Sequence, residues 1–320
     1  MKSKNKVSVA AKGAKNKPLV GFIGQGFVGK AYADDFESRG FSIVRYSLEE
    51  AYRNNKEKIR DCDVVFIAVP TPTTEKGFDD SIIRGAVKLV KRGKVAIIKS
   101  TILPGTTASI QKENPDIFVF HSPEFLTEVN ARFDAAHPTR NIIGIPVKSK
   151  TSEAKAKEVL AILPKAPFEL VTGAEEAELV KYGGNCWFYF KVIFINMLYD
   201  VAAKKNIDWN TVRDAMAADP RIGRTHLDPI HKSGRGAGGH CFIKDFAAFS
   251  DMYKDMVGDV AGLKVLESLR DKNIDLLMKS NKDFDLLSGV YGEEFLSNFK
   301  VKPKASDKGS MPVSSKKKNV

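Results

Sequence analysis

The chain has 320 residues, 43% of them hydrophobic, and a formal net charge of +12. This length and composition exclude a fibrous or wholly disordered chain and allow two globular domains, each with its own core. The charge does not indicate a basic binding face, because residues 1–17 and 299–320 each carry a net +6 and leave residues 18–298 neutral. We predict disordered, solubilising tails at residues 1–17 and 291–320, which could bind a polyanion such as RNA weakly. Neither nucleic acid nor a membrane is expected as a partner.

Three cysteines, Cys62, Cys186 and Cys241, form no C-x-x-C pair. An odd number without such a pair predicts neither a disulfide framework nor a zinc ribbon. The N-terminus lacks the apolar core of a signal peptide, so we expect a protein of the reducing cytoplasm. The longest apolar stretch, residues 185–203, is interrupted by a lysine, an asparagine and an aspartate, which predicts a buried helix of a soluble protein.

Short β-branched runs alternate with helical patterns in the first half of the chain. This alternation predicts an α/β fold with a Rossmann-type, doubly wound parallel sheet in a cofactor domain of residues 18–172. The predicted strands are residues 18–24, 41–46, 63–69, 94–99, 117–121, 140–145 and 167–171, and residues 151–163 form a covering helix.

From residue 173 onward the pattern changes to long amphipathic segments with no convincing strand. It predicts an all-α central domain of residues 173–290. The predicted helices are residues 174–204, 208–218, 245–256 and 259–278, and the glycine-rich residues 221–239 form a loop between two of them.

A dinucleotide-binding turn follows the first predicted strand. Gly24, Gly26 and Gly29 form G-x-G-x-x-G between a strand and a helix. Gly24 permits the tight turn, Gly26 lets the backbone approach a pyrophosphate at the helix N-terminus, and Gly29 allows close packing of helix on strand. The second strand ends at Ser47, where an acid usually binds the ribose. Arg45, on the same strand, could bind the 2′-phosphate of NADP. The glycine turn alone therefore does not distinguish NAD from NADP.

The loops after the third and fourth strands carry Val69, Pro70, Thr71 and Thr101. Ligands of open α/β sheets bind beyond the carboxyl ends of the strands, so these loops are expected to face the nicotinamide half of the cofactor. Pro70 and Pro72 could stiffen a loop that must stay clear of the cofactor. They are equally typical of an ordinary rigid turn between a strand and a helix.

Two further pairs of polar residues suit catalysis. Glu124 and Glu128, after the fifth strand, could bind sugar hydroxyls or move protons, or could start a capped helix. Lys181 and Asn185 share one face of the long helix, with Glu178 one turn before them. They could stabilise an oxyanion, or Lys181 could form a solvated Lys–Glu pair.

The glycine-rich residues 234–239 lead to Cys241. Glycines at this density let backbone amides surround a ligand, and they deliver Cys241 to an expected helix N-terminus, where a thiolate is favoured. A structural role is expected instead for Cys62 and Cys186. The histidines nearby match no usual zinc spacing, so no metal is predicted.

Taken together, six motifs in order resemble the UDP-glucose/GDP-mannose dehydrogenase family, over about residues 18–260. They are the G-x-G-x-x-G turn, Val-Pro-Thr-Pro, Ser-Thr-x-x-Pro-Gly-Thr, Ser-Pro-Glu-Phe-Leu, Lys-x-x-x-Asn and G-x-G-G-x-Cys-Phe-x-Lys-Asp. The resemblance implies NAD as cofactor, a homodimer formed through the long central helix, and a sugar or nucleotide sugar as substrate. It also implies a four-electron oxidation of a primary alcohol to a carboxylate.

The resemblance implies a covalent mechanism in which Cys241 forms a thiohemiacetal and then a thioester. Lys181 and Asn185 would stabilise the oxyanion, Asp245 and a water near Thr101 would manage protons, and Glu124 would assist hydrolysis. Cofactor contacts are expected from Gly24, Gly26, Phe27, Val28, Gly29, Ser47, Val69, Pro70, Thr71, Thr101, Glu128 and Lys244. Substrate contacts are expected from Glu124, Phe125, Leu126, Lys181, Asn185, Gly236, Gly238 and Gly239.

The sequence departs from the family pattern at four positions: Ser47 replaces the ribose acid, Val129 a glycine, Ala237 an aromatic residue and Ile243 a proline. None of these removes a catalytic residue. The family's third domain, which binds uridine diphosphate, should begin near residue 290, so we expect a chain without it and with a weaker grip on the nucleotide.

Two alternatives stay open. A two-electron β-hydroxyacid dehydrogenase shares the fold and the Lys-x-x-x-Asn helix but needs no cysteine. A non-catalytic dinucleotide-binding relative would need neither the Lys-x-x-x-Asn helix nor the cysteine. The glycine-rich approach to Cys241 favours the four-electron enzyme.

Overall fold

The computed structural model describes residues 17–299 apart from residue 233. A seven-stranded sheet in the order β2-β1-β3-β6-β7-β8-β9 forms the first domain. Its strands are β1 (Val20–Ile23), β2 (Ile43–Tyr46), β3 (Val64–Ile67), β6 (Val95–Ile98), β7 (Phe118–His121), β8 (Arg140–Ile145) and β9 (Phe168–Gly173). The predicted Rossmann-type fold is confirmed, and all seven predicted strands are present.

The sheet is not parallel throughout, and this corrects the prediction. Strands β2, β1, β3, β6 and β7 are parallel, but β8 runs antiparallel to β7, and β9 is parallel to β8. The connection from β7 to β8 spans residues 122–139 and contains α4 (Ala131–Ala136). It returns to the sheet at the end where β7 stops, so β8 runs back along β7 with His121 opposite Gly144.

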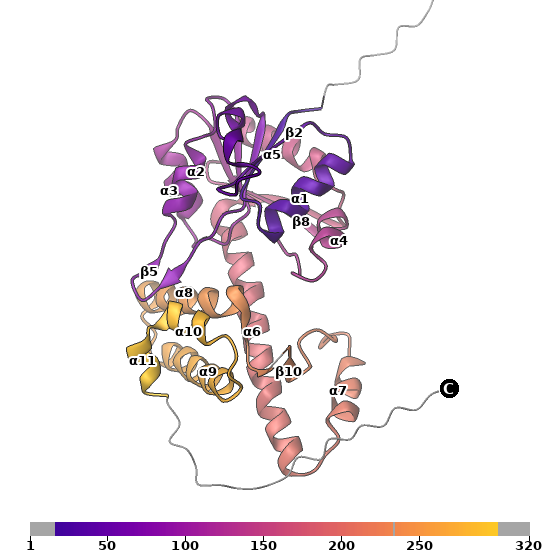
Figure 1. Cartoon of the computed structure of the whole chain (residues 1–320), viewed down its shortest axis with the longest axis vertical. Coiled ribbons are helices and arrows are strands. Elements are labelled where there is room, and N and C mark those ends of the chain that lie inside the picture. The colour runs from indigo at the N-terminus through magenta and orange to yellow at the C-terminus, as the bar shows by residue number, and fades with distance from the viewer. Residues whose placement is uncertain (1–16, 233, 300–320) are drawn as a thin grey trace, which may run out of the picture.

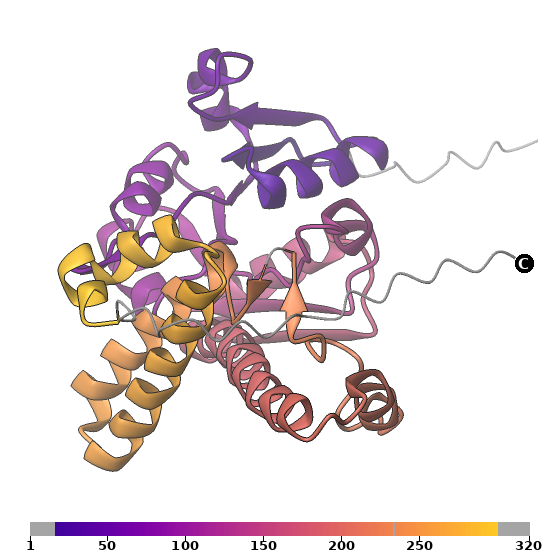
Figure 2. The same ribbon diagram turned by 60° about the horizontal axis from the view of Figure 1, so that its bottom comes forward.

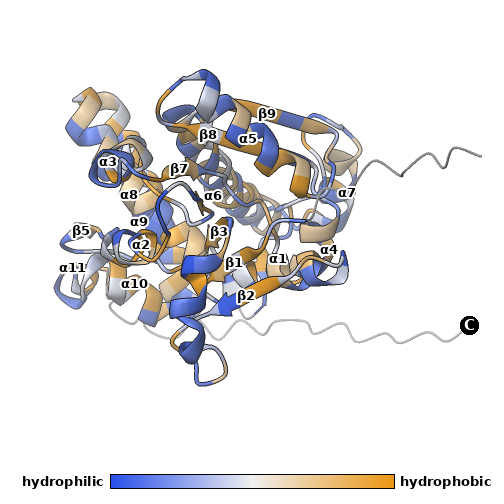
Figure 3. Cartoon of the chain, turned by 90° about the horizontal axis from the view of Figure 1, so that it is seen from above, coloured by the Kyte–Doolittle hydropathy of each residue, from blue (hydrophilic) through white to orange (hydrophobic). Residues whose placement is uncertain are grey.

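Helices cover both faces of this sheet. On one face lie α1 (Phe27–Ser38), α4 (Ala131–Ala136) and α5 (Lys150–Ile162), and on the other lie α2 (Ser81–Val87) and α3 (Thr106–Glu113). Alternate residues of each strand, such as Phe66 and Ile67, enter the two opposite cores. Viewed from above, β1 and β8 are largely hydrophobic strands between the helices (Figure 3). Burial on both faces explains the continuous apolar runs in the sequence.

The predicted helical second domain is confirmed, with small differences. It contains α6 (Ala174–Lys204), α7 (Trp209–Ala217), α8 (Gly239–Val257) and α9 (Val260–Lys279). Helix α8 begins six residues before the predicted start, at Gly239. Two short hairpins were missed because their strands have two residues each: β4 (Thr73–Thr74) with β5 (Gly77–Phe78), and β10 (Ile230–His231) with β11 (Gly234–Arg235). Two 3-10 turns, Arg53–Asn55 and Glu57–Asp61, precede β3.

The C-terminal segment before residue 300 is helical, which corrects the prediction of a disordered tail from residue 291. Helices α10 (Phe284–Tyr291) and α11 (Glu293–Ser297) follow α9. Leu287 and Leu296 are buried against Ile243, Ile274 and Leu277, so apolar burial orders this segment. The remaining tail predictions, for residues 1–16 and 300–320, lie outside the described residues.

Helix α6 has 31 residues and runs from the sheet through the length of the second domain (Figure 1). Among the described helices it alone is long and apolar enough to cross a membrane, a test that core helices of soluble proteins also pass. The prediction that it is buried is wrong for one face: Trp187, Phe194 and Val201 are exposed.

Glu178 of α6 ties this helix to the N-terminus of α3. Its carboxylate is fully buried and accepts hydrogen bonds from the backbone N–H of Gly105 (2.7 Å) and of Thr107 (2.8 Å) and from the Thr107 hydroxyl. Burial raises the pKa of this carboxyl, although these hydrogen bonds oppose the rise. A carboxylate at this position satisfies N–H groups that α3 leaves without partners.

We predict that Glu178→Ala lowers the free energy of unfolding by about 3 kcal/mol, because buried donors lose their acceptor. Urea denaturation would measure this loss. Glu175→Ala, an exposed site in the first turn of the same helix, should change stability by less than about 0.5 kcal/mol. Equal effects of the two substitutions would contradict the capping role.

Candidate active site

A cavity of about 1080 Å³ lies beyond the carboxyl ends of the parallel strands. The strand order reverses between β1 and β3, the point at which open α/β sheets bind ligands. The cavity is lined by the turn after β1, the loops after β3 and β6, the first turn of α8, and α10. Figure 2 shows α10 and α11, in yellow, beside the orange helices of the second domain, and α10 also contacts β4 of the first domain.

The turn after β1 has the backbone geometry of a dinucleotide site. Gly24 has φ +90°, and a Cβ there would lie 2.1 Å from the Ala68 carbonyl oxygen. A Cβ on Gly29 would lie 2.0 Å from the carbonyl oxygen of Gly24, whereas a Cβ on Gly26 would meet nothing within 4 Å. Gly26 thus leaves open space at the N-terminus of α1, where a pyrophosphate fits. Phe27 and Val28 line the same cavity.

The adenosine end of the cavity is lined by Ser47, with Glu49 and Lys56 beside it. The Arg45 guanidinium does not line the cavity. It forms ion pairs of 2.8 Å with Asp34 and Glu37 of α1. Arg45 is therefore neutralised by α1, and the possibility that it binds a 2′-phosphate loses its support.

The loops after β3 and β6 are bonded to each other. The Thr71 hydroxyl donates to the Thr101 carbonyl oxygen at 2.8 Å, and the Ser100 hydroxyl donates to the Val69 carbonyl oxygen at 2.7 Å. Val69, Pro70, Thr71 and Thr101 all line the cavity, as their positions after the strands predicted. These bonds fix the two loops in one arrangement.

Lys181 and Glu124 form a buried ion pair, of which Glu124 lines the cavity. The Lys181 ammonium donates to the Glu124 carboxylate at 2.7 Å and to the Glu124 carbonyl oxygen at 2.8 Å. The other carboxylate oxygen accepts from the Leu126 N–H at 2.8 Å. Both simpler alternatives are therefore wrong: Lys181 is not in a solvated pair, and Glu124 lies seven residues before α4 and does not cap it.

Eight of the expected ligand contacts are not among the residues that line the cavity: Gly29, Phe125, Leu126, Glu128, Lys181, Asn185, Gly236 and Gly238. Glu128 is exposed and lies 3.7 Å from Lys232. Phe125 stacks under the Arg140 guanidinium at 3.6 Å, and Leu126 packs against the core of the first domain. The predicted roles of Glu128, Phe125 and Leu126 at the cofactor and substrate have no support from these contacts.

Cys241 lies in the first turn of α8 and lines the cavity. One turn later, Asp245 is 1% exposed and accepts a hydrogen bond from the Asn185 amide at 2.6 Å. Lys244 also lines the cavity and donates to Asp245. Residues from α6 and α8 thus meet beside the thiol.

The electrostatics of Cys241 correct one expectation. Burial raises the pKa of this thiol, and the Asp245 carboxylate raises it further, while Lys181 and Lys244 oppose the shift. The start of a helix does not by itself favour the thiolate here, because the thiol is desolvated next to a buried carboxylate. The resting protein holds a thiol, and a base must take its proton during a reaction.

Lys99 was missed as a site residue. It lines the cavity at 3% exposure, donates to the Ser122 hydroxyl at 3.1 Å, and lies 4.3 Å from the centre of the Tyr32 ring. Burial lowers the pKa of this lysine to about 7. The sequence does contain a signal for Lys99, because a lysine directly after a buried, apolar strand is unusual.

No metal site competes with this interpretation within the described residues, where no group of three or more His, Cys, Asp or Glu side chains could hold an ion.

Comparisons with known proteins agree with this geometry. Residues 46–163 match the NAD binding domain of the UDP-glucose/GDP-mannose dehydrogenase family, and residues 175–274 match its central domain. The cofactor is accordingly NAD, in agreement with the glycine turn and the open space at Gly26.

Curated relatives extend the match. The putative UDP-glucose 6-dehydrogenase YtcA of Bacillus subtilis is 31% identical, over 72% of this chain and 55% of its own. The UDP-glucose 6-dehydrogenase YwqF of the same organism is 30% identical, over 88% of this chain and 68% of its own. That of Rickettsia prowazekii is 30% identical, over 80% of this chain and 60% of its own. The chain thus spans little more than half the length of several of these relatives.

Solved structures share the fold. A UDP-glucose dehydrogenase from the hyperthermophilic archaeon Pyrobaculum islandicum superposes with a TM-score of 0.70 at 25% identity, over 86% of this chain and 73% of that one. A 3-hydroxyisobutyrate dehydrogenase of Mycobacterium tuberculosis superposes with a TM-score of 0.65 at 15% identity, over 86% of this chain and 98% of that one. At that identity the second likeness concerns the fold alone.

We predict that Asp245→Asn accelerates alkylation of Cys241 by iodoacetamide at neutral pH, because loss of the adjacent negative charge lowers the thiol pKa. The pH midpoint of alkylation in the wild type should lie above that of free cysteine and should fall in the variant. Site-resolved mass spectrometry measures both. Asp251→Asn, at an exposed position of the same helix, serves as the control, and an unshifted midpoint in Asp245→Asn would refute the argument.

Proposed function

The chain belongs to the UDP-glucose/GDP-mannose dehydrogenase family, and we propose that it oxidises the primary alcohol of a sugar or nucleotide sugar to a carboxylate, as a UDP-glucose 6-dehydrogenase does. One observation carries the proposal. Cys241 lines the same cavity as the dinucleotide turn at Gly24 and Gly26, and the charges of Lys181, Lys244 and Asp245 act on its thiol. A dehydrogenase without a covalent step has no need of a thiol in this place.

Two hydrides leave the substrate carbon in sequence, and two molecules of NAD, bound one after the other, would each accept one of them. After the first oxidation, the Cys241 sulfur attacks the aldehyde carbon and a C–S bond forms, which gives a thiohemiacetal. The second oxidation leaves a thioester. Water then attacks the carbonyl carbon, the C–S bond breaks, and the thiol and a carboxylate are released.

Lys181 and Asn185 are suited to stabilise the oxyanion of these tetrahedral species. An ammonium has three N–H donors, of which Glu124 occupies two. An amide nitrogen has two donors, of which Asp245 occupies one. Each side chain therefore keeps one donor, already oriented by its other contacts, which is the preorganisation that oxyanion stabilisation requires.

Proton transfer is assigned to two carboxylates. We assign Asp245, together with a water near Thr101, to the proton of the substrate hydroxyl and of the Cys241 thiol. Glu124 is assigned to the water that hydrolyses the thioester, because its carboxylate lines the cavity beside Lys181. The mechanism also needs a free thiol, which suits a reducing cytoplasm.

The two-electron β-hydroxyacid dehydrogenase is the second candidate, favoured by a likeness in fold over nearly the full length of such an enzyme. It assigns no role to Cys241. A thiol in the cavity therefore favours the four-electron reaction.

We further propose a homodimer through the exposed face of α6. Val180, Trp187, Phe194 and Val201 are exposed and recur every seven residues, the spacing of a helix–helix seam. Gly183 and Gly184 lie between the first two, and a Cβ on either would meet nothing within 4 Å. Adjacent glycines without packing inside the chain let a second backbone approach closely.

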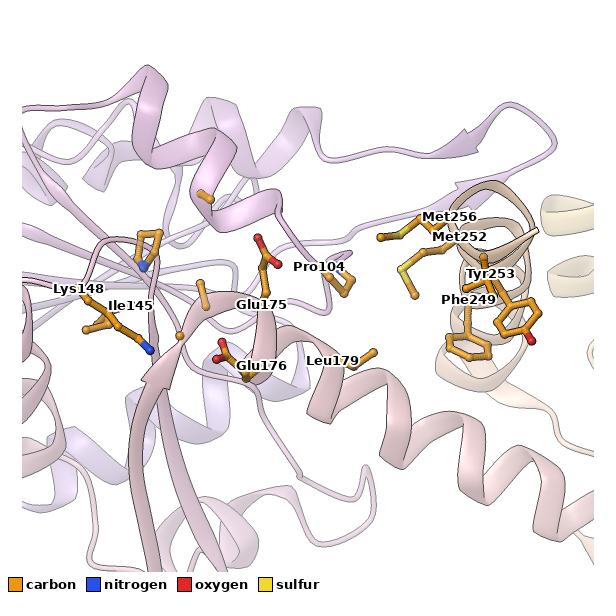
Figure 4. Close-up of a pocket in the computed structure, with 15 residues that line it drawn as sticks. Pro104, Ile145, Lys148, Glu175, Glu176, Leu179, Phe249, Met252, Tyr253 and Met256 are labelled. Carbon is orange, nitrogen blue, oxygen red and sulfur yellow. The ribbon is translucent and has the colours of Figure 1, made fainter. Parts of the chain in front are cut away.

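A separate apolar groove of about 660 Å³ lies at the N-terminal end of α6, where Leu179, the residue before Val180, lines it. In Figure 4, Met252 and Met256 of α8 extend toward Pro104 and Leu179. Large apolar patches of this kind mark protein–protein contacts. A second copy of the chain, packed along α6, would cover the groove together with the exposed residues.

We predict that the wild type releases two NADH for each carboxylate formed, and that Cys241→Ser forms carboxylate more slowly by about a thousandfold or more. NADH absorbance and mass spectrometry of the product, with a panel of sugars and UDP-sugars, measure both quantities. Cys62→Ala controls for the loss of an unrelated thiol. One NADH per substrate would support the β-hydroxyacid dehydrogenase, and an unchanged rate in Cys241→Ser would end the covalent mechanism.

We predict that Trp187→Glu converts the dimer to a monomer, because it places a charge in the centre of an apolar interface. Sedimentation velocity measures the state of each protein. Phe133→Glu is a matched control, since Phe133 on α4 is 64% exposed and Trp187 is 63% exposed. A wild type that sediments as a monomer at high concentration would exclude this interface.

A further inference from the structure

The loop that leads to Cys241 is bonded to the C-terminal half of α9 and to the turn that joins α9 to α10, together called the α9–α10 segment. The Asn273 side chain accepts from the Ala237 N–H at 2.7 Å and donates to the Ala237 carbonyl oxygen at 3.0 Å. The Ser280 hydroxyl oxygen accepts from the Arg235 N–H at 3.0 Å. This loop therefore depends on contacts that are about 40 residues distant in the sequence.

The glycines of the loop fit against this segment, which gives a reason for their presence that is independent of any ligand. A Cβ on Gly234 would lie 2.5 Å from Ser280 Cβ, and a Cβ on Gly236 would lie 3.0 Å from Asn273. A Cβ on Gly238 would lie 2.0 Å from the Asp283 carboxylate. Close approach to Ser280 thus requires glycine at position 234, the positive φ of +91° favours it at position 236, and a side chain at position 238 would displace the Asp283 carboxylate.

Asp283 makes the last contact before the nucleophile. Its carboxylate accepts from the N–H of Gly239, the first residue of α8, at 2.7 Å. Lys282, immediately before it, is buried and donates to the Gly236 carbonyl oxygen at 3.2 Å. Cys241 lies two residues after the Gly239 N–H that Asp283 binds.

The conformation of Asp283 is unusual for a helix cap. It is the N-cap residue of α10, yet its side chain makes no capping hydrogen bond to α10. Its backbone lies in the left-handed region at φ +54°. A left-handed non-glycine residue costs about 1–2 kcal/mol, so its surroundings must stabilise it. Here the carboxylate is directed to the start of another helix.

The same turn leads into a wall of the active-site cavity. Four residues of α10 line it: Asp285, Leu286, Gly289 and Val290. Ile243, which follows Cys241 by two residues, packs against Leu287 of α10 and also lines the cavity. The α10 residues lie beyond residue 274, where the match to the central domain of the family ends.

We propose that Asp283 is a positioning residue for Cys241. By binding the first N–H of α8, it fixes the thiol at the cavity and joins the nucleophile to the α10 wall. The catalytic part of this inference rests on the proposed function, whereas the effect on the accessibility of the thiol does not.

The experiment uses the full chain and compares three variants. Asp283→Gly removes the acceptor and relieves the left-handed strain, so its effect cannot come from added strain. Asp283→Asn keeps an acceptor oxygen in a residue that tolerates this conformation. Asn281→Gly is the matched control, because Asn281 is an exposed left-handed residue of the same turn at φ +50°.

The first measurement is the alkylation rate of each cysteine, resolved by mass spectrometry. We expect Asp283→Gly to raise the rate at Cys241 by about tenfold, because the start of α8 is released, while Cys62 and Cys186 stay protected. Asp283→Asn and Asn281→Gly should stay within about twofold of the wild type. The second measurement is turnover, where Asp283→Gly should lower kcat by about 10- to 100-fold with little change in the KM for NAD.

Each outcome is decisive. An unchanged rate at Cys241 in Asp283→Gly, or equal exposure of all three cysteines, would overturn the proposal, because the second result indicates general loss of stability. A wild type without dehydrogenase turnover would defeat the proposed function, but the alkylation result would still test Asp283.

Discussion

Glu178, Lys181 and Asn185 lie on one stripe of α6, and each bonds a different segment of the site. Glu178 accepts from the start of α3, Lys181 donates to Glu124 after β7, and Asn185 donates to Asp245 of α8. All three contacts are at least partly buried, and an unpaired charge there would cost several kcal/mol. The orientation of α6 therefore determines how the cofactor loops and the thiol are arranged.

This dependence has an electrostatic consequence for the thiol. The side chains that orient α6 also surround Cys241 with acids and bases in nearly equal number, and desolvation then dominates its pKa. A protonated thiol is resistant to oxidation and alkylation while it waits for substrate. The positive charges nearby remain close enough to favour the anion that forms when a carbonyl carbon is attacked.

Features with a local physical cause were predictable from the sequence. The turn at Gly24 and Gly29 and the helix start near Cys241 depend on backbone geometry within a few residues. Features that depend on distant partners were not predictable. The neutralisation of Arg45 by Asp34 and the pairing of Lys181 with Glu124 join separate elements of the fold. The direction of β8 and β9 in the cofactor-domain sheet was also not predictable, because strands that run antiparallel to their neighbours can have the same apolar pattern as parallel ones.

The C-terminal helices illustrate a second limit. Helix α10 has eight residues, too few for its apolar spacing to be distinguished from that of a loop. Its burial depends on Ile243, where the sequence departs from the family's usual proline. Glycines 234, 236 and 238 were correctly identified as unusual, but their partner is another part of the chain, and nothing in their spacing indicates which.

The junction between the domains has a mechanical consequence. Strand β9 ends at Gly173, and α6 begins at Ala174, so no linker separates the sheet from the second domain. A continuous helix of 31 residues transmits rotation over about 46 Å and offers no hinge at this junction. Any rotation of one domain against the other would have to break the buried bonds of Glu178 and Lys181 to the first domain, so the short segments around the mouth of the cavity offer the easier route of entry.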